Sequence, residues 1–116
     1  MLNGVYLVVF QSSLATMGEA IVVFDACGVH GANENHVLRG RQEEGEDLRL
    51  LLLVEACHLH GEKYPSFGPR SAVKLELEVT VVTEDGFRAT GTIIEANGIR
   101  LNVVAKKLSE LAGVES

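Results

Sequence analysis

The clearest structural pattern in the chain is the stretch Ala72-Val-Lys-Leu-Glu-Leu-Glu-Val-Thr-Val-Val-Thr83. Its apolar residues recur at every second position from Val73 to Val81, and a lysine, glutamate or threonine stands between them. Successive side chains of a β-strand point to opposite faces, whereas a helix would scatter these residues around its axis. The pattern therefore predicts a long strand with one buried face and one solvated face.

The same period of two extends outward from this stretch over most of the chain. Further strands are predicted over Gly4 to Gln11, Glu19 to Asp25, His36 to Arg41, Asp47 to Cys57, Phe87 to Glu95 and Ile99 to Lys106. A short additional strand is predicted around Val29 and His30. Asp85-Gly86 and Asn97-Gly98 are typical of tight hairpin turns, so the last three long strands should be antiparallel neighbours.

Length and composition fit one globular domain over residues 1–116. Hydrophobic residues make up 47% and charged residues 22%, which is enough apolar surface to bury a core. The predicted fold class is all-β, a small antiparallel up-and-down barrel of about seven to eight strands. The segment 58–71 holds both prolines and is predicted as a loop with a short helical turn. The spacing of Leu108 and Leu111 predicts a short helix or a tail packed on the sheet, ending near Gly113.

Charge and hydropathy exclude several classes of protein. The net charge is −6, from 10 basic and 16 acidic residues, and this sign opposes direct binding of nucleic acid. No apolar run approaches the ~20 residues that span a bilayer, and no basic flank precedes the first apolar stretch. We therefore expect a cytoplasmic protein that contacts no membrane. Cys27 and Cys57 are expected to be small buried thiols in a reducing compartment. The alternative is one disulfide bond between them.

Two of the predicted strands are apolar on both faces, in the stretches 5–10 and 50–54. A fully buried leucine contributes about 1.5–3 kcal/mol, so an outer apolar face of this size should be covered. We expect a homodimer in which a second subunit covers Leu51, Leu53, Val5 and Leu7. The alternative cover is the C-terminal tail together with the 58–71 loop.

The residues that could carry chemistry do not form a convincing active site. His58 and His60 share one strand face and could bind a metal with Glu55 and Glu62, but structural zinc usually needs four convergent ligands. Cys57 and the adjacent His58 point to opposite faces, which excludes a nucleophile–base pair. The chain has no nucleophile elbow, P-loop or dinucleotide-binding motif. We predict no catalytic residue, no metal and no cofactor, and hence no enzyme.

The acidic run Glu43-Glu44-Gly45-Glu46-Asp47 is the most distinctive polar feature of the sequence. It falls in a predicted hairpin loop between two strands. Such a run is either a solubilising turn or a docking site, because clustered charge raises encounter rates and selects partners of opposite sign. Glu43, Glu44, Glu46 and Asp47 are therefore the candidate partner-binding residues.

Several short motifs resemble the GrlR-like family, whose described member is a repressor in the regulation of bacterial type III secretion. They are Asn3-Gly4-Val5-Tyr6, Gly18-Glu19-Ala20-Ile21-Val22, Gly31-Ala32-Asn33, the acidic run that follows, and Val104-Ala105-Lys106. The resemblance covers most of the chain. It implies a lipocalin-like barrel that forms a homodimer and restrains a transcriptional activator through an exposed acidic loop. Gly45 interrupts the acidic run here, which is a departure from that family.

Two functions from different classes follow from these observations. The first is a non-enzymatic regulator that sequesters a transcriptional activator, a protein with a basic DNA-binding region, through the acidic loop. The alternative is a lipocalin-like carrier, since a barrel of about eight strands can hold one small apolar ligand.

Overall fold

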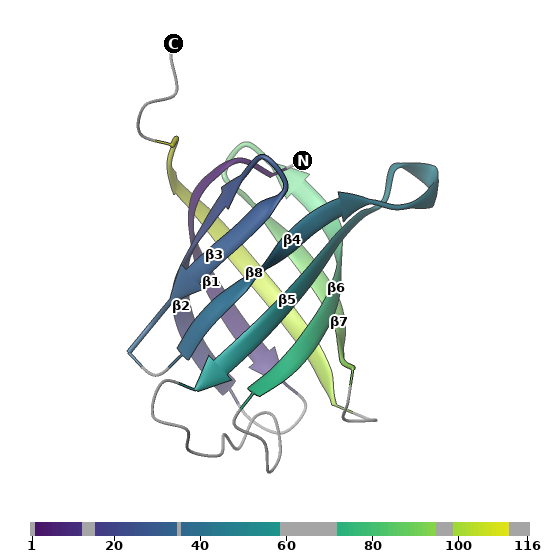
Figure 1. The fold of residues 1–116 in the computed structure, drawn as a ribbon. Helices are drawn as coiled ribbons and strands as arrows, with labels where there is room; N and C mark the ends of the chain where they lie inside the picture. Colours follow the sequence, from purple (N-terminus) through teal and green to yellow (C-terminus); the bar gives the residue numbers. More distant parts are fainter. Residues whose placement is uncertain (1, 13–15, 35, 59–71, 95–98, 112–116) are drawn as a thin grey trace.

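The structure is a computed structural model that describes residues 2–12, 16–34, 36–58, 72–94 and 99–111. Within these ranges the chain forms eight strands: β1 (Gly4–Ser12), β2 (Thr16–Asp25), β3 (Gly28–Ala32), β4 (His36–Glu44), β5 (Leu50–His58), β6 (Ala72–Thr83), β7 (Gly86–Ile93) and β8 (Arg100–Ser109). Each strand is antiparallel to the next, and β8 pairs with β1, which closes the barrel (Figure 1). The predicted all-β, antiparallel up-and-down barrel is confirmed.

The strand boundaries agree with the sequence pattern best where the alternation is regular. β6 begins and ends at the predicted residues, and the short strand around Val29 and His30 is present as β3. Of the two alternatives for the C-terminus, the helix is wrong at Leu108, which lies in β8. Pairing with β1 continues to Ser109, so the backbone groups of this segment are satisfied by the sheet and not by a helix. Residues 59–71 and the turn Asn97-Gly98 lie outside the described residues.

Apolar side chains fill the inside of the barrel. The rings of Tyr6, Phe24 and Phe87 meet edge to face, with centroids 5.3, 5.4 and 5.5 Å apart. All three residues are buried, with exposed fractions of 5% or less. The cavity that remains among the described lining residues measures about 20 Å³, which is room for about one water molecule.

Two glycines allow neighbouring strands to approach closely as the sheet curls. A Cβ atom at Gly40 would collide with the carbonyl oxygen of Leu53, and one at Gly91 would collide with that of Glu76. Glycine inside a strand often marks a tight bend at a barrel corner. These two positions therefore help to close β4 against β5 and β6 against β7.

Candidate functional site at the acidic end of the barrel

The up-and-down strand order places the β2–β3, β4–β5 and β6–β7 turns at one end of the barrel, because successive strands reverse direction (Figure 1). Exposed carboxylates gather on these three turns. We call this set the acidic end; its members are Asp25, Glu44, Glu46, Asp47, Glu84 and Asp85.

The β4–β5 hairpin presents its carboxylates on a defined turn that projects beyond the barrel wall (Figure 1). The Gly45 N–H donates to the Arg49 carbonyl at 2.6 Å, and the Arg49 N–H donates to the Glu46 carbonyl at 3.2 Å. A 3₁₀ turn spans Glu46–Leu48, and Asp47 lies in the left-handed region with φ 59°. Aspartate is one of the few residues with a side chain that visits this region readily.

Neighbouring cations neutralise one of the four predicted partner-binding residues and leave three unpaired. Glu43 forms an ion pair with Arg41 at 3.0 Å. Arg49, the cation nearest the turn in sequence, is bound in two hydrogen bonds of 2.8 and 3.0 Å to Glu78. Within the described residues no ion pair involves the other three carboxylates, which are those of Glu44, Glu46 and Asp47.

The structure adds Glu84 and Asp85 to the site, which the sequence reasoning treated only as a turn. The Asp85 N–H donates to the Thr83 hydroxyl at 3.2 Å, and the Asp85 carbonyl accepts from the Lys107 N–H at 2.6 Å. These contacts leave the side-chain carboxylate of Asp85 exposed. The signal that could have found the pair is strand parity: in an up-and-down barrel, every second hairpin turn opens at the same end.

Exposed valines lie beside these carboxylates at the end of β6. Val81 and Val82 are 48% and 59% exposed. The pairing of β6 with β5 stops at Val79 opposite Leu50, so β6 continues past its neighbour with one side unpaired. The acidic end therefore offers apolar contact area as well as charge.

Lys107 is held by its own neighbour at this end of the barrel. Its ammonium group donates to the Glu110 carboxylate at 2.9 Å. This hydrogen bond raises the pKa of Lys107 above its ordinary value. Lys107 is therefore already engaged and is not directed at Glu44, Glu46 or Asp47.

The four predicted dimer residues fall on opposite sides of the molecule. Val5 and Leu7 point outward from β1, whereas Leu51 and Leu53 point outward from β5. Three strands separate β1 from β5 in either direction around the closed barrel. The structure therefore does not bring the four residues together on one face.

Long polar side chains explain why the outward leucines of β5 are half-buried in a single chain. In the register of the sheet, Leu53 stands between Arg41 and Glu76. Leu51 likewise stands between Glu43 and Glu78. The aliphatic stems of such side chains cover neighbouring apolar surface while their charged ends stay in water.

The cysteines differ from the expectation that both are buried. Cys57 lies on the outer face of β5 opposite Val37 and is half-buried, and Cys27 is exposed at the β2–β3 turn. Both are free thiols. The His60 and Glu62 of the possible metal site, with the His58 side chain, lie outside the described residues. In the described part of the chain, no three metal-ligating side chains cluster together.

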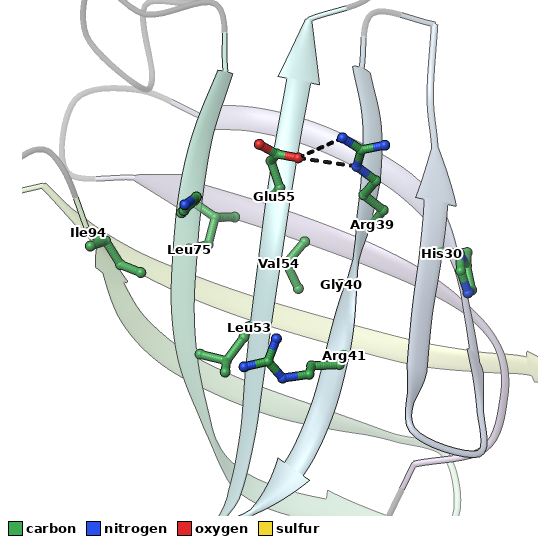
Figure 2. Close-up of a pocket in the computed structure, with 10 residues that line it drawn as sticks. His30, Arg39, Gly40, Arg41, Leu53, Val54, Glu55, Leu75 and Ile94 are labelled. Atoms are coloured by element: carbon green, nitrogen blue, oxygen red, sulfur yellow. Dashed lines mark hydrogen bonds and ion pairs between the residues drawn. The ribbon is translucent and has the colours of Figure 1, made fainter.

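A groove of about 670 Å³ crosses the outer wall over β3 to β6 (Figure 2). Arg39, Arg41 and Lys74 are among the residues that line it. Arg39 binds Glu55 at 3.1 Å, and Arg41 is held by Glu43. Because both guanidinium groups are paired within the chain, and Lys74 also has an interaction partner, the groove offers shape but little free charge for recognising an anion.

No helix in the described ranges has the length and hydropathy needed to cross a lipid bilayer. No protein-family model matches this chain, and no curated protein is significantly similar to it.

Proposed function

We propose that the protein is a non-enzymatic, protein-binding regulator that holds a basic, DNA-binding transcriptional activator at its acidic end. The observation that carries the proposal is the gathering of six exposed carboxylates from three separate turns at one end of a rigid barrel. None of the six forms an ion pair within the described residues.

Clustered like charges repel one another, so hydration or an oppositely charged partner must stabilise them. A surface of one sign also steers a partner of the other sign and raises its association rate. The exposed Val81 and Val82 supply an apolar contact that a purely solubilising turn would not need. This combination suits a basic amphipathic segment, the kind of segment with which many proteins contact DNA.

The resemblance to the GrlR-like family supports the same function, because an acidic loop is the binding element in that family. Gly45 removes one charge from the local run in this chain. Glu84 and Asp85 add two carboxylates at the same end of the barrel. The acidic end as a whole therefore keeps a high density of negative charge despite the interruption.

The interior of the barrel gives less support to the carrier alternative. Pockets for drug-sized ligands measure roughly 300–1,000 Å³, whereas the interior cavity among the described residues is about 20 Å³. Tyr6, Phe24 and Phe87 occupy the space that an apolar ligand would need. The geometry thus favours recognition on the outside of the barrel.

Affinity capture with charge-neutral variants tests the proposal. The wild-type protein, the double variant Glu46→Gln/Asp47→Asn and the double variant Glu34→Gln/Glu76→Gln are immobilised and exposed to extract of the native cells. Each double variant removes two negative charges, but Glu34→Gln/Glu76→Gln removes them away from the acidic end. All four substituted residues are exposed, so the folds should be unchanged.

We expect mass spectrometry to identify a DNA-binding protein that wild type and Glu34→Gln/Glu76→Gln retain and Glu46→Gln/Asp47→Asn loses. Duplex DNA carrying the partner's site should compete for it. Equal retention by all three proteins would refute docking at the acidic end.

A further inference from the structure

We infer that a groove on the outer wall over β6, β7 and β8 binds a small phosphate monoester that has an apolar body. The groove measures about 590 Å³, and sites for small molecules measure roughly 300–1,000 Å³. We call it the cationic groove; the exposed side chains that line it are those of Val81, Thr83, Asp85, Arg88, Val104 and Lys106. The inference does not depend on the proposed function, because its ligand is an anion and is tested on the chain alone.

The cationic groove holds the two basic side chains that the rest of the described chain leaves unengaged. Carboxylates or other groups of the chain engage the remaining basic side chains in the described ranges, which are those of Arg39, Arg41, Arg49, Lys74, Arg100 and Lys107. Arg88 and Lys106 form no ion pair within those ranges. In a chain with a net charge of −6, two free cations in one groove mark a place that can attract an anion.

The register of the sheet makes these two cations neighbours. Arg88 lies opposite Val104, and Gly86 lies opposite Lys106, across the β7–β8 pair. Arg88 and Lys106 are therefore diagonal neighbours on one face of the sheet, about 7–8 Å apart, and both side chains are long enough to reach a common anion between them. Gly86 carries no side chain, so nothing projects beside Lys106 to fill this part of the groove.

The two kinds of cation suit a phosphate group. The guanidinium group of Arg88 can donate to two phosphate oxygens at once, and the ammonium group of Lys106 supplies a compact charge to a third. A phosphate monoester carries about 1.5 to 2 negative charges at neutral pH, so the two cations balance it. A carboxylate has one charge and two oxygens and would leave one of the cations unmatched.

Exposed valines on both sides of Arg88 supply the contact for an apolar body. Val81 lies opposite Arg88 on β6, and Val104 lies opposite Arg88 on β8. The two valines are 48% and 50% exposed. An organic phosphate can therefore cover apolar surface with its body while its phosphate group lies on the cations, and an inorganic ion cannot.

The carboxylates of the β6–β7 turn favour a compact ligand over an extended anionic surface. Asp85 lies at the turn end of the cationic groove, next to the exposed Glu84. A membrane of anionic lipids or an acidic protein would contact these carboxylates as well as the cations and would be repelled by them. A small ligand with one anionic group avoids them, and the Asp85 carboxylate can accept a hydrogen bond from its hydroxyl or ammonium group.

Isothermal titration calorimetry of the full chain with phenyl phosphate, inorganic phosphate and phenol tests the inference. Arg88→Gln and Lys106→Gln each remove one charge from the cationic groove. Arg39→Gln and Lys74→Gln are the matched controls, because they remove the same charges from the groove over β3 to β6. All four side chains are exposed, and circular dichroism checks that each variant is folded.

We expect phenyl phosphate to bind the wild type with a dissociation constant of about 1 mM or lower. Arg88→Gln and Lys106→Gln should each weaken binding by about ten-fold, because each removes a charge-assisted hydrogen bond, whereas both controls should stay within about two-fold of the wild type. Inorganic phosphate should bind about three-fold or more weakly than phenyl phosphate, and phenol should not bind. No binding of phenyl phosphate, or equal losses in the controls, would overturn the inference.

Two further measurements test the apolar body and the source of the phosphate. Val104→Thr keeps the shape of the side chain but adds a hydroxyl, so it should weaken phenyl phosphate by about two- to five-fold and leave inorganic phosphate unchanged. Vesicles of phosphatidylcholine with phosphatidic acid, a lipid phosphate monoester, should not sediment the protein. Sedimentation that Arg88→Gln abolishes would assign the cations to a lipid surface and overturn the small-molecule inference. Neither cation belongs to the acidic end, so failure here leaves the affinity capture unaffected.

Discussion

The side-chain amide of Gln42 is hydrogen-bonded to the backbone of Leu2 in both directions. The Leu2 N–H donates to Gln42 Oε1, and Gln42 Nε2 donates to the Leu2 carbonyl, each at 2.8 Å. Nε2 also donates to the Ala26 carbonyl at 2.9 Å. Gln42 is 1% exposed, so this amide takes the place of a strand partner and ties the start of the chain to β4 and to the β2–β3 turn.

Replacing this glutamine by a residue of similar size should destabilise the fold. We expect Gln42→Leu to lower the free energy of unfolding by about 2–4 kcal/mol, because it leaves the buried N–H and carbonyl of Leu2 without partners and removes the part-buried hydrogen bond to the Ala26 carbonyl. Urea unfolding measures the change. Gln11→Leu, on the exposed face of β1, is the control and should change the free energy of unfolding by less than about 0.5 kcal/mol. A change for Gln42→Leu as small as that of the control would show that the buried amide contributes nothing.

A truncation inside the barrel should convert the filled core into a binding cavity. Phe24→Ala removes the ring that contacts both Tyr6 and Phe87. We expect it to cost about 3–5 kcal/mol of stability and to leave a dry cavity that accepts benzene. Thermal unfolding with and without benzene should show stabilisation of the variant only; the same stabilisation of the wild type would contradict a filled interior and favour the carrier alternative.

The effect of a Gly→Ala substitution on stability should distinguish the glycines that the closed sheet requires from those that it does not require. At Gly91 a Cβ would collide with the Glu76 carbonyl and approach Leu77 Cα to 2.8 Å, so Gly91→Ala should destabilise by about 1–3 kcal/mol or more. Gly45 has an extended φ of −94°, and its nearest contact would be Leu51 Cδ1 at 3.4 Å. Gly45→Ala should therefore be close to neutral in the same unfolding measurement, and a neutral Gly91→Ala would count against the close strand approach.

Restoring a charge at the interrupted position should strengthen partner binding. Because Gly45 accepts a side chain, Gly45→Glu adds a carboxylate to the β4–β5 turn without straining it. We expect the affinity for a basic partner to rise by about two- to ten-fold at low salt and the gain to shrink as salt screens the charges. Gly45→Gln is the matched uncharged control in surface plasmon resonance, and a gain shared by both variants would show that charge is not its cause.

The strand pattern was largely predictable from the sequence because it depends on local alternation. Val73 to Val81 fixes β6, and β3 could be detected from two residues around Val29. The end of β8 was not predictable, because Leu108 and Leu111 have helical spacing and only the long-range pairing with β1 keeps Leu108 in a strand. The prediction that Cys57 is buried was wrong for a related reason, because the apolar run on β5 does not show which alternate positions face the lumen.

The candidate site was predictable only in part. The β4–β5 carboxylates are adjacent in sequence, whereas Glu84 and Asp85 join them through strand parity, which requires the strand count to be right. The neighbours of the outward leucines and valines were also not predictable, because Leu7 and Leu53 are similar in sequence context. Only the register shows that Leu53 lies between Arg41 and Glu76, while Leu7 lies between Ile21 and Lys106.

Recognition of a basic segment by the acidic end is the central element of the proposed function. The most direct measurement is an NMR titration of the isotope-labelled protein with an arginine-rich helical peptide, followed through the backbone amide shifts. We expect the shifts to concentrate at Glu44, Glu46, Asp47, Glu84 and Asp85 and to disappear in the Glu46→Gln/Asp47→Asn variant. Shifts centred on the groove over β3 to β6, or spread evenly over the barrel, would contradict binding at the acidic end.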